Sequence, residues 1–220
     1  MDTDERKRRT PRHDRYGLVL ILLLVVMFFV PLDASALRPV VTALLGAVLL
    51  FAQRTSGARR SVVWASLVLI VVAVIASGAA QWAGEDAAQL VYSSIVLVLC
   101  LATIGTIGVH LVNDPSLDVH AVLGVIAVFV LVGLAFAAIF AILDNVQGGF
   151  FAQDVSGNPG VDYFYFSFTT ITTAGFGDLT PAKDLGKMFV AFEALIGQVY
   201  LVTVVSLAVS GVSRRRRGGE

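Results

Sequence analysis

The sequence predicts an all-α membrane protein, and three observations support this fold class. The chain of 220 residues is 57% hydrophobic and 15% charged, with a mean hydropathy of +0.83, whereas a soluble domain of this size exposes far more Lys and Glu. Apolar runs long enough to cross about 30 Å of hydrocarbon recur along the chain. Each run is apolar all round rather than along one stripe, as expected for helices in lipid.

The apolar runs predict six transmembrane helices. They lie at about 17–32, 38–53, 61–83, 87–112, 119–143 and 185–210. The breaks between them are turn-like or charged, for example "RTSGARR" and "NDPSLD", and the longest break runs from Asp144 to Asp184. No internal repeat of 20–50 residues is visible.

Basic residues predict how these helices are oriented. Six Lys and Arg precede the first span, three lie in "RTSGARR" and four form "RRRR" at 214–217, which makes 13 of the 16. The other three, Arg38, Lys183 and Lys187, fall on the opposite side. The positive-inside rule then places both termini in the cytoplasm of a multi-pass protein of the plasma or inner membrane, and an even number of spans satisfies this. The basic ends are expected to attract anionic lipid, and no nucleic acid is expected as a partner.

The first apolar run has a second interpretation. A basic head, an apolar run and "ASA" at 34–36 also fit a cleavable signal peptide. The run from Gly17 to Leu32 is long for a signal core, so a retained first helix is preferred. Cleavage would not change the topology downstream.

The connection between the fifth and sixth spans predicts a re-entrant loop. Its segment "VDYFYFSFTTITT", residues 161–173, is apolar and aromatic but too short to cross the membrane and return. We expect a half-helix over 161–172 that enters the membrane, followed by an extended exit over 173–178. Irregular backbone at membrane depth survives only where it is buried in protein or lines an aqueous path.

Glycine alternates with other residues in "TAGFG". Because glycine tolerates positive φ, left- and right-handed conformations can alternate there, and successive carbonyls can point to one side. Such carbonyls, with the Thr173 hydroxyl, would replace the water around a monovalent cation. The half-helix runs inward from Asp162, so its negative dipole end near Thr172 favours a cation at the membrane centre.

The segment "TTAGFGD" resembles the potassium-channel signature, Thr-Val-Gly-Tyr-Gly-Asp preceded by Thr. It matches that signature at Thr172, Thr173, Gly175, Gly177 and Asp178, and it departs at Ala174, where Val is usual, and at Phe176, where Tyr is usual. Phe176 lacks a hydroxyl that could tie the filter to surrounding aromatics, and Ala174 loosens packing behind it. Neither departure alters the carbonyls. The resemblance covers about residues 119–210.

The resemblance implies a potassium channel that is a fourfold homotetramer, because one such loop cannot close a ring. The implied K+ ligands are Thr173, Ala174, Gly175 and Phe176, with Gly177 completing the filter; Thr172, Asp178, Glu193 and Thr169 are the implied filter support. K+ ions in the filter are expected, and no other cofactor. No nucleophile–base pair, metal cluster or phosphate-binding loop is visible, so we do not expect an enzyme.

The sixth span carries the remaining candidates. Gly197 lies 24 residues beyond Thr173, where similar channels carry a hinge glycine, although it can equally permit close helix packing. Gln198, Leu201 and Val205 share one helical face, which the resemblance places on the central cavity. Glu193 is the only acid inside this span. It could bond to a pore-helix threonine such as Thr169, add negative potential to the outer vestibule, or reach the interface.

The predicted domains are a basic cytoplasmic tail (1–16), a sensor-like four-helix unit (17–113), a pore domain (119–210, with pore helix 161–172, filter 173–178 and inner helix 185–210) and a short basic tail (211–220). Six spans with one pore loop resemble the voltage-gated architecture, whose fourth span carries arginine at every third position. The span 87–112 carries none. We therefore expect opening to depend weakly on voltage.

Three other functions stay open. A non-selective monovalent cation channel is compatible with Ala174 and Phe176. A secondary transporter would use the broken segment as its substrate site, although no inverted repeat is visible and Glu193 is the one acid within a span. A non-conducting accessory subunit is the third.

Overall fold

The computed structural model describes residues 16–29, 37–55, 58–82, 84–113, 119–155 and 159–206. Over these ranges the protein is helical: α1 (Tyr16–Phe29), α2 (Arg38–Thr55), α3 (Arg60–Ala79), the 3₁₀ turn η3 (Ala80–Trp82), α4 (Glu85–Asn113), α5 (Val119–Gln147), α6 (Pro159–Ile171), α7 (Asp184–Val199) and the π-helix η4 (Tyr200–Val205). The β structure within these ranges is one isolated antiparallel bridge, between Phe151 and Pro181.

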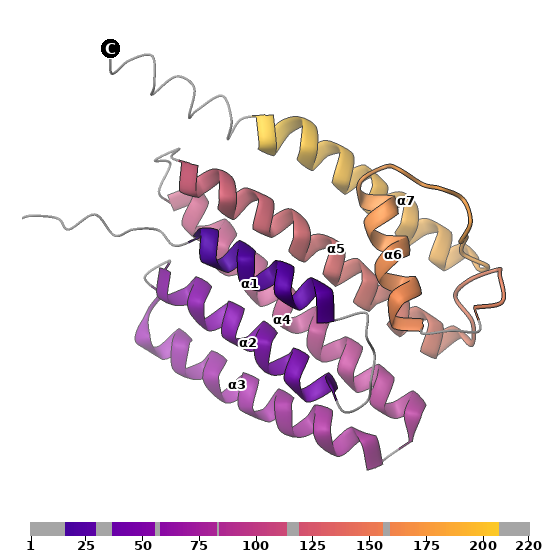
Figure 1. Cartoon of the computed structure of the whole chain (residues 1–220), viewed down its shortest axis with the longest axis horizontal. Coiled ribbons are helices and arrows are strands. Elements are labelled where there is room, and N and C mark those ends of the chain that lie inside the picture. Colours follow the sequence, from indigo (N-terminus) through magenta and orange to yellow (C-terminus); the bar gives the residue numbers. More distant parts are fainter. Residues whose placement is uncertain are drawn as a thin grey trace, which may run out of the picture.

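The helices form one bundle with α5 at its centre. α1 to α5 and α7 run roughly along one direction, whereas the shorter α6 crosses that direction beside α5 and α7 (Figure 1). α5 packs against α4, α1 and α6, and α2 packs between α3 and α4. The start of α1 and the end of η4 lie toward the same end of the bundle (Figure 1).

Four helical stretches are long and apolar enough to cross a membrane: Arg60–Ala79, Glu85–Leu111, Val122–Gln147 and Asp184–Val202. The apolar part of α1, Gly17–Phe29, is shorter. Arg38 and Arg54, at the two ends of the 18-residue α2, lower its average apolarity. The described part of the protein is thus helical and matches a membrane protein, with four helices long and apolar enough to cross a bilayer, and the six-span topology remains a prediction.

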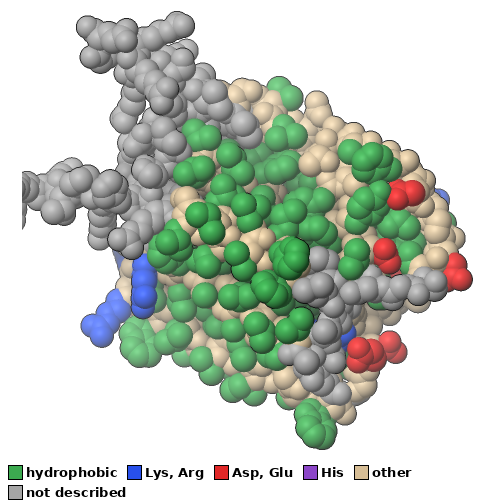
Figure 2. All heavy atoms as spheres, in the orientation of Figure 1, with side chains coloured by type: hydrophobic (Ala, Val, Ile, Leu, Met, Phe, Trp, Pro, Cys, Tyr) green, Lys and Arg blue, Asp and Glu red, His purple; other side chains and the backbone are tan. Residues whose placement is uncertain are grey.

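The surface matches a helical membrane protein. In Figure 2 a broad hydrophobic face separates a basic group at the left end from acidic side chains at the right end. α3 exposes many large apolar side chains, among them Val68, Val72 and Ile75 at 60%, 57% and 64%. Because lipid tails are as apolar as these side chains, such exposure suits a helix at the lipid boundary.

An aromatic cluster holds α6 against α5. Its members are Phe136, Phe140, Phe150, Phe151, Tyr163 and Phe166, all buried. The Phe140 and Phe150 rings stack at 4.8 Å between centroids, and Phe151 stacks on Tyr163 at 5.6 Å. Stacked aromatic pairs add geometric preference to area burial, so the cluster fixes the position of α6 as well as stabilising it.

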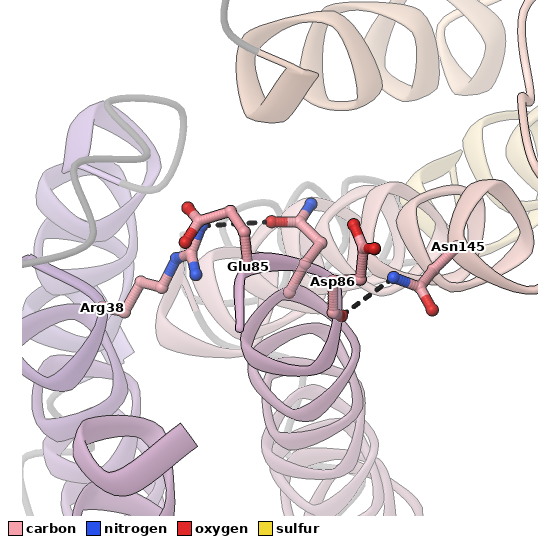
Figure 3. Close-up of polar contacts among 5 residues, drawn as sticks. Arg38, Glu85, Asp86 and Asn145 are labelled. Atoms are coloured by element: carbon pink, nitrogen blue, oxygen red, sulfur yellow. Dashed lines mark hydrogen bonds and ion pairs between the residues drawn. The ribbon is translucent and has the colours of Figure 1, made fainter. Parts of the chain in front are cut away.

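Polar contacts join α2, α4 and α5 at one end of the bundle (Figure 3). The Arg38 guanidinium lies 3.2 Å from Glu85 Oε1 and donates to Gln89 Oε1 across 3.4 Å. Asn145 Nδ2 donates to the Asp86 carbonyl across 2.8 Å. We call these residues (Arg38, Glu85, Asp86, Gln89, Asn145) the outer polar link. The buried charge of Arg38 is thereby engaged at the end of α2.

Candidate ion-conduction site

The half-helix predicted between the fifth and sixth spans is α6, Pro159–Ile171. Pro159 suits the first helical position, where its missing N–H costs nothing, and Asp162 lies in the first turn, where a carboxylate complements the dipole. At the other end, Thr172 Oγ1 donates to the Phe168 carbonyl across 2.6 Å, and Thr173 N donates to the Thr170 carbonyl across 2.9 Å. These bonds end the helix at the start of "TAGFG".

The backbone after α6 alternates in hand. φ is +60° at Thr173, +48° at Gly175 and +78° at Gly177. Glycine adopts these values without strain, whereas a residue with a side chain is disfavoured there by about 1–2 kcal/mol. The Gly175 N–H donates to the Thr169 carbonyl across 3.0 Å, which ties the first turn to α6.

Residues 172–178 are all exposed on the single chain. Ala174 lies between the two left-handed positions at Thr173 and Gly175, and Phe176 is 71% exposed. The segment therefore presents irregular polar backbone that its own chain does not cover.

A tyrosine of α6 contacts this segment at two residues. Tyr165 Oη donates to Asp178 Oδ2 across 2.8 Å, and its ring stacks on Phe176 at 6.2 Å with 5° between the planes. The hydrogen bond to Asp178 raises the pKa of Tyr165 above its ordinary value. The hydroxyl absent from Phe176 is thus supplied by a residue of α6.

The chain leaving this segment is paired with the chain that follows α5. Ala152 N donates to the Thr180 carbonyl, and Ala182 N donates to the Phe150 carbonyl, both across 2.8 Å. The Gln153 side chain forms two hydrogen bonds with Thr180. Its Nε2 donates to the Thr180 hydroxyl, and its Oε1 accepts from the Thr180 backbone N–H. These bonds hold the exit from residues 172–178 against the end of α5.

Charged and polar groups also cap α5. Lys183 Nζ donates to the Gln147 and Gly148 carbonyls, and Asp144 Oδ1 accepts from the Phe150 N–H. Gly148 has a φ of +65°, the left-handed conformation that commonly follows a helix. A cation at the carboxyl end of a helix is favoured by the dipole.

Glu193 is bound to α6, but not through the predicted partner. Its Oε1 lies 2.5 Å from Ser167 Oγ, whereas the Thr169 hydroxyl donates to the Phe166 carbonyl across 3.0 Å. Residues two positions apart on a helix, such as Ser167 and Thr169, point in nearly opposite directions. One carboxyl therefore cannot reach both hydroxyls. Glu193 is 0% exposed, and it therefore reaches neither an outer vestibule nor the interface.

Gly197 is a close-packing glycine. A Cβ at this position would lie 2.1 Å from the carbonyl oxygen of Ile171, the last residue of α6. This finding bears out the packing interpretation, and a hinge at Gly197 remains a proposal. The inner helix, expected to be continuous over 185–210, changes at Tyr200 into the π-helix η4. The Tyr200 hydroxyl donates to the Val125 carbonyl of α5 across 2.7 Å.

The proposed cavity face is only partly described. Gln198 of α7 and Leu201 of η4 are exposed on the single chain, whereas Glu193 and Gly197 of α7 are buried. The Val205 side chain and the residues beyond 206 lie outside the described residues.

Sequence reasoning missed Tyr165 and Ser167. Ser167 had a signal, because it is the one non-aromatic residue in "YFYFSF", and a lone hydroxyl among aromatics indicates a buried hydrogen bond. Tyr165 had none, because its partner Asp178 lies on the far side of an irregular turn.

A family model matches the part of the chain that contains this site. Residues 125–213 match the family described as "Ion channel". A hyperpolarization-activated voltage-gated potassium channel of Methanocaldococcus jannaschii is 40% identical over 58 residues, 24% of this chain and 28% of that protein. The two pore potassium channel c of Oryza sativa subsp. japonica is 32% identical over 98 residues, 44% of this chain and 20% of that protein.

An inward rectifier potassium channel of Paramagnetospirillum magnetotacticum is 32% identical over 88 residues, 40% of this chain and 27% of that protein. The chain therefore spans less than a third of the length of each of these relatives. The family match includes α6, residues 172–178 and α7. The chain is thus similar to ion channels over residues 125–213 and to three proteins named as potassium channels, and these similarities support the potassium channel superfamily.

Proposed function

We propose that four copies of the chain form a potassium-selective channel that conducts K+ passively. The observation that carries the proposal is the alternation of positive φ at Thr173, Gly175 and Gly177 directly after the carboxyl end of α6. An alternating backbone can turn successive carbonyls toward one axis, which is how carbonyl oxygens replace the hydration shell of K+.

The ligands for K+ in this proposal are the carbonyls of Thr173, Ala174, Gly175 and Phe176 and the hydroxyl of Thr173. The carboxyl end of α6 lies directly before these residues, so the helix dipole favours a cation there. Gly177 and Asp178 complete the turn, and Tyr165 holds Asp178 in place. K+ is cargo here, and no covalent step is involved.

The exposed backbone supports assembly around a shared axis. Polar, irregular backbone at residues 172–178 cannot face lipid, so it needs cover from other copies or from a water-filled path. Next to it, α7 and η4 carry an exposed apolar stripe with steps of three and four residues: Leu185, Met188, Phe192, Leu195, Val199 and Val202. We assign this inner-helix stripe to contact with a neighbouring copy in a fourfold ring.

Charge placement supports weak voltage dependence. α4 contains no Lys or Arg, and in α2 and α3 the arginines lie at the helix ends. Moving charge across the field is what couples opening to voltage. The relative named as voltage-gated matches 24% of this chain and therefore does not extend that property to it.

The deciding experiment is ion flux into liposomes that contain the purified chain, with Gly175→Ala as the test variant. Alanine is strained at the φ of +48° and should abolish K+ flux. Gly148→Ala is the matched control, because it introduces similar strain at a φ of +65° with open space around it, away from residues 172–178. Flux that persists in Gly175→Ala would mean that the ions take another route.

The same preparation separates the alternatives. Reversal potentials in mixed K+ and Na+ distinguish a potassium-selective pore from a non-selective cation channel, the candidate that Ala174 and Phe176 favour. Saturable, proton-coupled uptake would indicate a secondary transporter. Folded protein that gives no flux alone would indicate an accessory subunit.

A further inference from the structure

Three helices bring oxygen atoms together behind the proposed filter. Ser167 Oγ of α6 lies 2.5 Å from Glu193 Oε1 of α7 and 2.7 Å from the Gly133 carbonyl oxygen of α5. Ser167 and Glu193 are both 0% exposed. Both distances are within the range of O–H···O hydrogen bonds, so each contact requires a proton between its two oxygens.

The number of protons decides the state of Glu193. A serine hydroxyl has one proton to donate, and the Gly133 carbonyl can only accept. If Glu193 were ionised, it too could only accept, and one of the two short contacts would join two oxygens with no proton between them. A protonated Glu193 removes the conflict, because it donates to Ser167 Oγ and Ser167 donates to Gly133.

The surroundings of Glu193 agree with a neutral acid. Among the described residues of α5, α6, α7 and the segments between them, the Lys and Arg side chains are Lys183 and Lys187. Lys183 contacts the end of α5, and Lys187 contacts Asp184. Glu193 Oε2 is buried and has no hydrogen-bond partner in the described part of the chain. Burying an ionised carboxylate without a cation is far more costly than burying the carbonyl oxygen of a neutral acid.

We propose that Glu193 is a protonated carboxylic acid that donates to Ser167, and that this Glu193–Ser167–Gly133 relay positions α6 between α5 and α7. Ser167 is a positioning residue in this scheme. It lies two residues before Thr169, whose carbonyl accepts from the Gly175 N–H, so a shift of α6 would move the proposed filter. The relay adds no charge to the conduction path.

Infrared spectroscopy tests the proton directly. The chain has four glutamates (Glu5, Glu85, Glu193 and Glu220), so glutamate labelled with ¹³C in its side-chain carboxyl makes assignment simple. Folded wild-type protein at neutral pH should show the C=O stretch of a protonated glutamate, shifted by the label. Glu193→Gln should remove this band, and Glu85→Gln, the control at an exposed site, should keep it. An absent band in folded wild-type protein, or a band retained in Glu193→Gln, would overturn the proposal.

Ser167 has its own readout. Ser167→Ala deprives Glu193 of its acceptor, so the same band should move to higher frequency, and Ser167→Thr should restore its position. A role confined to packing would leave the frequency unchanged in Ser167→Ala, which would overturn the relay. These spectra require no conduction.

The positioning role rests on the proposed function and is tested by K+ flux. Glu193→Gln should retain flux, since its amide can donate to Ser167, whereas Glu193→Ala should lose it. Equal loss in both variants would overturn the neutral relay. If the wild-type protein showed the band but gave no flux, the channel proposal would fail while the proton assignment stood.

Discussion

Tyr165 donates a 2.8 Å hydrogen bond to Asp178, joining the middle of α6 to the far end of the alternating segment that follows it. Phe176, two residues before Asp178, has its ring almost parallel to that of Tyr165. One tyrosine therefore restrains both the side chain that replaces the usual filter tyrosine and the acid beyond it.

Tyr165→Phe should destabilise the conducting form of the proposed filter. The variant keeps the ring stacked on Phe176 but removes the donor to Asp178, which contributes about 1 kcal/mol. Single-channel recordings in bilayers should show shorter openings or a lower open fraction than wild type. In the double variant Tyr165→Phe with Asp178→Ala, the second change should add less than it does alone, because the two residues share one interaction.

Alkaline solution offers a milder test of the same bond. The hydrogen bond raises the pKa of Tyr165, so its stabilisation is present below the ordinary tyrosine pKa of about 10 and is lost only as pH rises through the higher folded value. The open fraction should hold from pH 7 to about pH 9. A fall within that interval in wild type but not in Tyr165→Phe would contradict this assignment.

Gly197→Ala should be strongly destabilising. The new Cβ would lie 2.1 Å from the Ile171 carbonyl oxygen, so α7 must move away from α6, and overpacking of this kind costs about 1–3 kcal/mol. Thermal unfolding in detergent measures the loss. Gly108→Ala in α4 is the matched control, since no atom lies within 4 Å of its added Cβ, and it should leave the midpoint unchanged or raise it.

Replacing two large side chains of the inner-helix stripe by alanine should weaken tetramer assembly. Phe192 and Leu195 are 61% and 60% exposed on the single chain, and replacing both by alanine removes apolar contact with the neighbouring copy. Native mass spectrometry at decreasing concentration should show earlier loss of the tetramer. The control pair is Val72→Ala with Ile75→Ala on α3, which is similarly exposed but assigned to lipid. Equal behaviour of the two pairs would argue against the stripe as the interface.

Lys183→Met should lower the melting temperature more than Lys187→Met does. Lys183 caps the carboxyl end of α5 through the Gln147 and Gly148 carbonyls, which contributes about 0.3–1 kcal/mol. Lys187 forms an exposed i,i+3 pair with Asp184, worth at most about 0.5 kcal/mol. Differential scanning fluorimetry compares the two, and the opposite order would show that Lys183 does not act as a cap.

Opening should depend weakly on membrane voltage. α4 has no Lys or Arg to move through the field, and Arg38 is engaged at the end of α2 by Glu85 and Gln89. Conductance–voltage curves from bilayers should therefore be shallow. Curves that require several gating charges per tetramer would refute this.

The parts of the fold that were predictable are those governed by nearby residues. Apolar runs gave helix bounds within a few residues for α3, α4 and α5, and the short aromatic segment gave α6. The alternation of glycine in "TAGFG" predicted positive φ at Gly175 and Gly177, because glycine adopts that conformation without strain.

The missed features depend on how distant residues meet. Ser167 rather than Thr169 faces Glu193 because of the rotation of α6 about its axis, which periodicity alone does not set against a second helix. The change to a π-helix at Tyr200 follows no local signal; there, the Tyr200 hydroxyl bonds to the Val125 carbonyl of α5.

The outer polar link has a consequence for mixed assemblies. Within one chain, Asn145 bonds to Asp86 and α5 packs along α4 and α1, so we expect the first four helices to remain beside α5 of the same chain. Each subunit of the proposed ring then keeps its own first four helices and does not exchange them with a neighbouring subunit. A substitution in the outer polar link would therefore affect only the subunit that carries it. Co-expressed variant and wild-type copies should give a response graded by the number of variant subunits in the ring.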